Sequence, residues 1–170
     1  MPVYAKESLG LQMMKLLIVS DSHGKWQDLQ RLTEQEKPDV VLHLGDHIAD
    51  AQKLSLACPH VEVEAVPGNC DGWFTNYETD RILSYDGMRF FLTHGHGYQV
   101  KSGSGGVIMA GKAAQADVIL FGHTHRAVLE QLSDGRWLVN PGTAGGVYEP
   151  ASYAVAWVDQ GTIRLELKTL

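Results

Sequence analysis

The chain has 170 residues, a length that suits one domain with an ordinary hydrophobic core. Fourteen Lys and Arg residues against 20 Asp and Glu residues leave a formal net charge of −6, which argues against stable nucleic-acid binding. The two cysteines form neither a zinc-binding pair nor a disulfide framework, so a reducing compartment, the cytoplasm, is expected. The unusual feature of the composition is its eight histidines.

The start of the chain lacks the features of a signal peptide. Residues 1–12 have no charged start, apolar stretch and small-residue cleavage site, and Met13 and Met14 come directly before the first apolar run. We expect residues 1–12 to be a disordered N-terminal extension and residues 13–170 to form a single domain. No run approaches the roughly 18 consecutive apolar residues of a membrane span, so no membrane contact is expected.

The first half of the chain alternates between strand and helix patterns. Short β-branched and aliphatic runs predict strands over residues 15–20, 39–44 and 61–66. Between them, apolar residues at helical spacing, each followed by a proline, predict helices over residues 26–37 and 48–57. This alternation favours an α/β fold with parallel strands.

The second half is richer in hairpin patterns. Three pairs of strands are predicted around turn residues: 81–85 with 88–93, 127–132 with 136–139, and 153–158 with 162–167. A helix is expected over residues 107–116, followed by a buried strand over residues 117–121. Together the two halves predict one α/β domain with mixed sheets.

Each strong predicted strand ends in side chains that can bind a metal. In chain order these are Asp21 with His23, Asp46, Asn69, His94, and His123 with His125. Sites in open α/β sheets lie beyond the carboxyl ends of the strands, so these side chains are expected to converge. The sequence therefore predicts one metal site that collects a cluster from each strand.

Each cluster taken alone has an ordinary structural explanation. Asp21 or Asp46 is more typical of a helix N-cap or a turn, Asn69 of a turn, and His123 with His125 of a solvated pair. Independent turns have no reason to place carboxylate, amide and imidazole at successive strand ends, so the whole set favours a metal site.

The ligand types indicate which metals the site would bind. Two carboxylates, an amide and four imidazoles suit Mn²⁺, Fe, Zn²⁺ or Ni²⁺. Seven ligands suit two ions, and a pair roughly 3.5–4 Å apart can clamp an in-line displacement at phosphorus.

The motifs around these residues resemble those of the calcineurin-like metallophosphoesterase superfamily. They also resemble, more narrowly, the small YfcE- and MJ-type phosphodiesterases of bacteria and archaea. The motifs are Asp21-x-His23, Gly45-Asp46, Gly68-Asn69-Cys70-Asp71, His94-Gly95-His96, Gly122-His123-x-His125 and Asn140-Pro141-Gly142-Thr143. The resemblance implies a four-layer α/β/β/α sandwich, in which helices flank two mixed β-sheets.

The resemblance also implies an activity, that of a metal-dependent phosphodiesterase. A hydroxide that bridges two divalent ions would attack phosphorus in line, with Mn²⁺ the first candidate and Ni²⁺, Fe or Zn²⁺ the others. The implied ligands of the first ion are Asp21, His23 and His125. Those of the second ion are Asn69, His94 and His123, and Asp46 would bridge the two. The implied partner is a small phosphodiester, and both a monomer and a homo-oligomer remain open.

One position departs from the superfamily pattern. Much of the superfamily has His where this chain has Cys70, which we expect to be a small buried packing residue. His96 is the nearest replacement for that His as a proton donor. Together with the implied ligands Asp46 and Asn69, it makes up the expected set of catalytic residues. Asn140-Pro141-Gly142-Thr143 is either a tight turn or a support for the site.

Several side chains near the motifs are expected to be structural. His43 and His60 are interpreted as structural, and His47 has no predicted role. Packing in the core or at the rim is expected for the aromatic residues close to the motif loops, Trp26, Trp73 and Tyr98.

Two other functions remain open. The first is a phosphomonoesterase, which Cys70 and the modest positive charge left beside two ions disfavour. The second is a protein-binding scaffold, since the eukaryotic retromer complex contains a subunit with the fold of this superfamily. The complete ligand set argues against such a loss of catalysis.

Overall fold

A computed structural model describes residues 13–72 and 76–170 of the chain. The expectations for the N-terminal extension, residues 1–12, and for Trp73 lie outside these residues. No helix within the described ranges is long and apolar enough to cross a membrane.

The first sheet joins the N-terminal strands to a C-terminal hairpin. Its strand order is β10-β9-β1-β2-β3, with β1 and β2 parallel, β2 and β3 parallel, and the hairpin antiparallel to β1. The strands are β1 (Met14–Val19), β2 (Val40–His43), β3 (Glu62–Ala65), β9 (Ser152–Asp159) and β10 (Thr162–Thr169).

The second sheet comes from the middle of the chain. Its order is β4-β5-β6-β8-β7, in which β5, β6 and β8 are parallel and the two edge strands are antiparallel to their neighbours. The strands are β4 (Asp80–Tyr85), β5 (Met88–Thr93), β6 (Val118–Leu120), β7 (Val128–Gln131) and β8 (Trp137–Asn140).

The two sheets pack face to face. In β1 the alternate residues Leu16 and Ile18 join the core between the sheets, together with Phe90 and Leu92 of β5. Leu17 and Val19 point to the opposite face, where they pack beneath the first two helices. Because both faces of β1 are covered, its sequence is apolar apart from Lys15.

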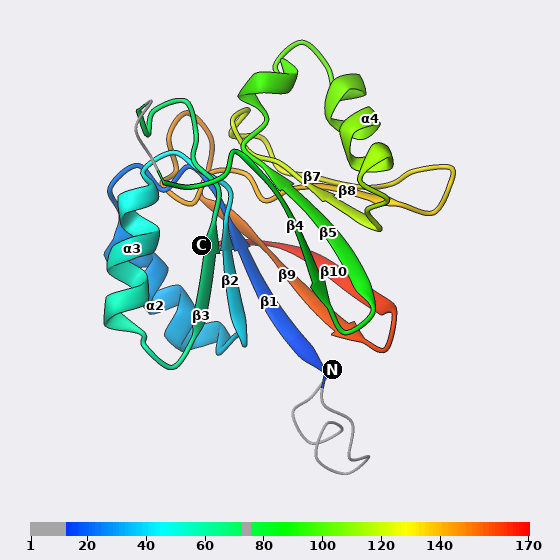
Figure 1. The fold of residues 1–170 in the computed structure, drawn as a ribbon. Helices are drawn as coiled ribbons and strands as arrows, with labels where there is room; N and C mark the ends of the chain where they lie inside the picture. The colour runs from blue at the N-terminus through cyan, green and yellow to red at the C-terminus, as the bar shows by residue number, and fades with distance from the viewer. Residues whose placement is uncertain (1–12, 73–75) are drawn as a thin grey trace.

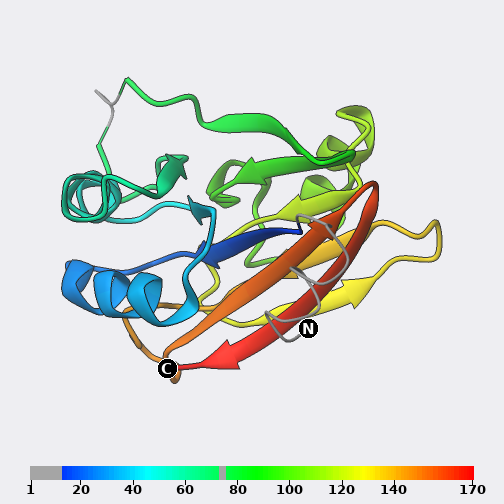
Figure 2. The same cartoon turned by 90° about the horizontal axis from the view of Figure 1, so that it is seen from below.

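Helices cover the outer faces of both sheets. The helices are α2 (Trp26–Glu36), α3 (Ile48–Ala57) and α4 (Gly105–Ala113), and a short 3₁₀ helix spans His96–Tyr98. Figures 1 and 2 show α2 and α3 beside the sheet that contains β1 and β2, and α4 beside the sheet that contains β5. The packing clusters agree with this placement. The predicted four-layer α/β/β/α sandwich of two mixed sheets is confirmed.

The predicted elements match the observed ones except near α4. This helix begins at Gly105, two residues before its predicted start, and ends at Ala113 because Gln115 adopts a left-handed backbone with φ of 55°. The 3₁₀ helix after His94 was not predicted, since its three residues carry no apolar periodicity. Tyr98 packs edge to face on Phe91, in agreement with the packing role expected for it.

The parallel strands of the two sheets direct their following loops to a common edge. The loop after β1 is joined to the loop after β2 by a hydrogen bond from Asp21 N–H to the Gly45 carbonyl, 2.9 Å long. In the second sheet, Gly122 N–H donates to the His94 carbonyl over 2.9 Å. Across the two sheets, His123 N–H donates to Asp21 Oδ2 over 3.1 Å, so the strand-end residues of both sheets meet at one place.

Candidate metal centre

Five of the seven predicted ligands have a left-handed backbone. The φ angles of Asp21, His23, Asp46, His123 and His125 lie between 47° and 69°. Non-glycine residues adopt this conformation at a cost of about 1–3 kcal/mol each, and residues held in this way cluster at functional sites. The loops after β1, β2 and β6 thus hold these polar residues in a backbone conformation that non-glycine residues adopt infrequently.

The first group of ligand atoms surrounds the Asp21 carboxylate. His125 Nε2 lies 3.2 Å from Asp21 Oδ1 and 3.4 Å from His23 Nε2. His23 Nε2 is also 4.0 Å from Asp21 Oδ1. With Asp46, these residues offer four ligand atoms that all lie within 4.8 Å of one another.

The second group surrounds the His94 imidazole. His94 Nε2 lies 3.1 Å from Asn69 Oδ1 and 3.2 Å from His123 Nδ1. Neither pair needs to be a hydrogen bond, since each of these atoms can present a lone pair to a cation.

The Asp46 carboxylate lies between the two groups. Its Oδ2 is 4.0 Å from His23 Nε2, and its Oδ1 is 3.5 Å from His94 Nε2. The structure therefore brings together all seven side chains predicted as ligands, in two groups that meet at Asp46.

Backbone carbonyls orient two of the imidazoles. His94 Nδ1 lies 2.6 Å from the Leu44 carbonyl, and His125 Nδ1 lies 2.9 Å from the Val147 carbonyl. A carbonyl only accepts, so each Nδ1 must donate its proton, and each Nε2 keeps a free lone pair toward the site. Such a bond to the outer nitrogen is typical of metal-binding histidines.

The titration of the site favours neutral imidazoles. Burial lowers the pKa of His94 to about 4, and burial followed by the neighbouring His94 lowers the pKa of His123 to about 4. Burial also raises the pKa of Asp21 to about 6, although hydrogen bonds from Ser20 and His123 act in the opposite direction. Neutral imidazoles are the form that binds a metal.

The Asn140–Thr143 segment supports the ligand loops. Asn140 Nδ2 donates to the Gly122 carbonyl and to Thr124 Oγ1, both over 3.0 Å. Thr143 Oγ1 donates to the Asp21 carbonyl over 2.9 Å. The segment is therefore more than a turn, because it ties the loop after β6 to the loop after β1.

The expectation that Cys70 is buried is wrong. The side chain is exposed at the rim of the site, since the tight turn closed by Asp71 N–H and the Gly68 carbonyl turns it outward. Its backbone N–H donates to Asp46 Oδ1 over 3.0 Å. Partial desolvation, followed by the Asp46 charge, raises the pKa of the thiol.

Two further histidines flank the ligands. The exposed ring of His96 lies 5.5 Å from the His94 ring and 6.1 Å from the His123 ring, centre to centre. His47, which had no predicted role, lies 5.0 Å from the His23 ring. Its position directly after Asp46 was the signal in the sequence that could have placed it here.

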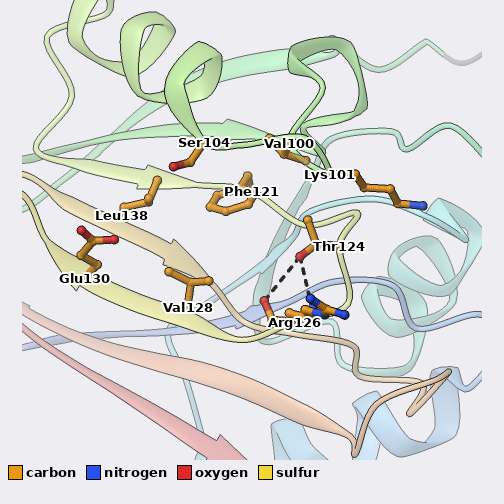
Figure 3. Close-up of a pocket in the computed structure, with 9 residues that line it drawn as sticks. All are labelled: Val100, Lys101, Ser104, Phe121, Thr124, Arg126, Val128, Glu130 and Leu138. Atoms are coloured by element: carbon orange, nitrogen blue, oxygen red, sulfur yellow. Dashed lines mark hydrogen bonds between the residues drawn. The ribbon is translucent and has the colours of Figure 1, made fainter.

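A groove adjoins the loop that carries His123 and His125. It has a volume of about 550 Å³, and its apolar floor includes Phe121 and Leu138. Figure 3 shows Thr124 and Arg126 at one end of this groove, with Lys101 nearby and Glu130 at the other end. The groove gives the site an adjoining surface of mixed polarity and of small-molecule size.

Comparisons with known proteins agree with this architecture. The probable metallophosphoesterase YsnB of Bacillus subtilis is 33% identical over 158 residues, covering 89% of each chain. The phosphodiesterase MJ0936 of Methanocaldococcus jannaschii is 29% identical over 149 residues, covering 78% of this chain and 86% of its own. These relatives confirm the resemblance to the small bacterial and archaeal enzymes.

The fold is also shared with a eukaryotic protein. A crystal structure of Vps29 from Entamoeba histolytica superimposes with a TM-score of 0.73 at 18% identity, covering 92% of this chain and 99% of that one. Residues 14–161 match the model of the calcineurin-like phosphoesterase superfamily domain, which is most of the sequence. The chain therefore belongs to the calcineurin-like phosphoesterase superfamily.

Proposed function

We propose that the chain is a metal-dependent phosphodiesterase that hydrolyses a P–O bond of a small phosphodiester with the help of two divalent ions. The observation that carries the proposal is the arrangement of seven ligand side chains in two groups that meet at Asp46. The relatives named as phosphodiesterase and metallophosphoesterase support the same chemistry.

One buried oxygen atom indicates whether the site can accommodate cations. Asp21 Oδ1 is buried and has no hydrogen-bond partner among the described residues. Isolated buried carboxylate oxygens are costly, whereas an oxygen that binds a cation is not isolated. The donor set, which combines carboxylate, amide and imidazole, also suits Mn²⁺ and similar ions. The side chains therefore fit divalent cations, with Mn²⁺ as the first candidate.

In this proposal each group holds one ion. Asp21, His23 and His125 hold the first, Asn69, His94 and His123 hold the second, and Asp46 binds both. When bound, the ions would supply an activated water nucleophile and neutralise the charge that develops on the phosphoryl oxygens.

Other side chains act on the substrate directly. In this proposal His96 donates a proton to the departing alcohol, and its exposed ring beside His94 and His123 supports that role. The groove beside the loop at His123 receives the organic part of the diester, and Lys101 and Arg126 favour an anionic substrate there. The free thiols of Cys58 and Cys70 suit a reducing compartment such as the cytoplasm.

An activity panel on reconstituted protein tests the proposal. The protein is stripped with a chelator, loaded with Mn²⁺, and assayed on a bis-aryl phosphate, an aryl monophosphate and cyclic nucleotides. We expect Mn²⁺-dependent hydrolysis of diesters. Asp46→Asn should lower kcat by at least about 100-fold, since it weakens the binding of both ions. Asp159→Asn, at the far end of β9, is the matched control and should leave kcat unchanged.

Two results would contradict the proposal. Faster cleavage of the monoester than of the diesters would make the protein a phosphomonoesterase. No hydrolysis of any ester, with two ions measured per chain, would remove both activities. The fold shared with Vps29 leaves a protein-binding scaffold as the second candidate, and that last result would favour it.

A further inference from the structure

A buried chain of three polar side chains lies behind the ligand loops. Ser22, His43 and Asp50 are 0%, 0% and 2% exposed, and none of them is a predicted ligand. Ser22 lies between Asp21 and His23, His43 ends β2, and Asp50 lies in the first turn of α3. Burial of three such groups is costly unless every polar atom is paired.

The hydrogen bonds along this chain permit one arrangement of protons. Gly45 N–H donates to His43 Nδ1 over 3.1 Å, so the proton of the neutral ring must be on Nε2. His43 Nε2 then donates to Ser22 Oγ over 2.8 Å, and the Ser22 hydroxyl donates to Asp50 Oδ2 over 2.6 Å. Gly24 N–H donates to the same oxygen over 2.8 Å. Burial lowers the pKa of His43 to about 4, in keeping with a neutral ring.

The hydrogen bonds of Ser22, His43 and Asp50 join two loops that contain left-handed backbone conformations. The loop after β1 holds Asp21 and His23 at φ of 53° and 47°, and the loop after β2 holds Gly45 and Asp46 at 99° and 58°. Such conformations persist where the surrounding contacts fix them. Gly45 is held from both sides, since its N–H bonds His43 and its carbonyl accepts from Asp21 N–H.

The residue types are those of a hydrolytic triad, but their order excludes that role. In a nucleophilic triad the histidine lies between serine and the carboxylate and removes the serine proton. Here Ser22 lies between His43 and Asp50, and its hydroxyl donates to the carboxylate. A serine that is 0% exposed also cannot reach a substrate.

We propose that Ser22, His43 and Asp50 are positioning residues that hold the Asp21–His23 loop against the Gly45–Asp46 loop, and so set the spacing of the ligands for the first ion. This inference rests on the proposed function, because the spacing matters only if these loops bind cations. It assigns a role to His43 beyond a general structural one.

Metal affinity tests this role separately from catalysis. Mn²⁺ binding to chelator-stripped protein is measured by calorimetry for four proteins: the unaltered chain, Ser22→Ala, Asp50→Asn and Thr33→Val. Ser22→Ala removes the central hydroxyl of this series of hydrogen bonds. It should lower the affinity for the first Mn²⁺ ion roughly 10- to 100-fold. Asp50→Asn keeps an oxygen that can accept from Ser22 and Gly24, so it should retain most of the affinity.

Thr33→Val is the matched control for the loss of a buried hydroxyl. Thr33 is 2% exposed, and its Oγ1 donates to the Leu29 carbonyl over 2.8 Å inside α2, away from the loops. It should lower stability without changing Mn²⁺ affinity. A second readout needs no variant: nitrogen-detected NMR of the unaltered chain should show His43 with its proton on Nε2.

Three results would overturn the inference. They are equal Mn²⁺ affinity of Ser22→Ala and Thr33→Val, loss of affinity in Asp50→Asn as large as in Ser22→Ala, or a His43 proton on Nδ1. If the unaltered chain binds Mn²⁺ with the expected pattern across variants but hydrolyses no ester, the positioning role stands and the proposed function fails. If the unaltered chain hydrolyses diesters while Ser22→Ala binds Mn²⁺ normally, the proposed function stands and the positioning role fails.

Discussion

Asp21 shows how the candidate metal centre affects the stability of the metal-free protein. Its carboxyl is buried, its Oδ1 has no hydrogen-bond partner among the described residues, and its pKa is raised from 3.8 to about 6 by burial. The folded protein therefore retains this proton to a higher pH than the unfolded chain does. Stability from this group is present below about pH 4 and is lost as the pH rises to about 6.

We predict that Asp21→Asn stabilises the metal-free protein. An amide keeps the shape, carries no buried charge, and can donate to His125 Nε2, which lies 3.2 Å from Oδ1. Urea unfolding with a chelator present should show a gain of about 1–3 kcal/mol at pH 8 that shrinks toward pH 4. Asp159→Asn, which is half-buried on β9, should show no such pH dependence. A less stable Asp21→Asn at pH 8 would contradict this account of the carboxylate.

The roles of His96 and Cys70 separate in a pH profile. The His96 ring is exposed beside His94 and His123, whereas the raised pKa of the Cys70 thiol makes it a weak proton donor. We predict that His96→Ala lowers kcat by about 10²–10⁴-fold for an alcohol that leaves poorly and alters the pH profile of kcat. Cys70→Ala should have little effect.

The control for this comparison is His60→Ala, an exposed histidine in the turn before β3. An unchanged profile in His96→Ala, together with slower turnover in Cys70→Ala, would assign the proton to Cys70.

At the scale of elements, close approach between two loops fixes the position of Asp46. A side chain on Gly68 would collide with Asp46 Oδ1 and place its Cβ 2.5 Å from the Asp46 backbone nitrogen. Gly45, with φ of 99°, approaches the Gly68 nitrogen equally closely, since a Cβ there would be 2.7 Å away. The loops after β2 and β3 therefore depend on two glycines to bring Asp46 beside Asn69.

We predict that Gly68→Ala destabilises the protein by about 1–3 kcal/mol, because the methyl group has no space. Urea unfolding of the metal-free protein measures the change. Gly105→Ala is the matched control, since nothing lies within 4 Å of a Cβ at that position. Equal effects of the two substitutions would show that the loop adjusts to the methyl group and that close approach does not fix the position of Asp46.

At the scale of the whole molecule, Glu36 ties the end of α2 to the first sheet. Its carboxylate accepts from Lys15 Nζ at 2.9 Å, Tyr153 Oη at 2.7 Å and Lys168 Nζ at 3.1 Å. Burial acts to raise the pKa of Glu36, but these hydrogen bonds prevail and lower it to about 2. The carboxylate thus joins a helix to β1, β9 and β10.

We predict that Glu36→Gln lowers the free energy of unfolding by about 1–3 kcal/mol at pH 7. A lowered pKa contributes stability above the unfolded value of 4.5, and that contribution is lost as the pH falls toward 2. The difference between variant and unaltered protein should therefore shrink across this range. Glu34→Gln, an exposed change on the same helix, should show no such trend. A deficit that persists at pH 2 would point to packing rather than charge.

The elements and the convergence of the candidate metal ligands could be predicted from the sequence because both have local signals. The runs of β1 and β2 are apolar apart from Lys15 in β1 and His43 at the end of β2, since both faces of each strand are buried, and polar residues follow where each strand ends. Strand ends on one side of a sheet must converge, so the seven ligands could be grouped before any contact was known.

Local signals did not reveal which neighbours complete the site. The exposure of Cys70, the place of His47 beside His23, and the support that Asn140 and Thr143 give depend on how loops from distant strands pack. The bonds from His43 through Ser22 to Asp50 join residues 21 and 28 positions apart. The sequence by itself determined the fold class and the ligand types, because periodicity and strand ends are encoded locally. The tertiary structure alone decided which polar groups are paired, because pairing depends on distances between segments that the chain order does not specify.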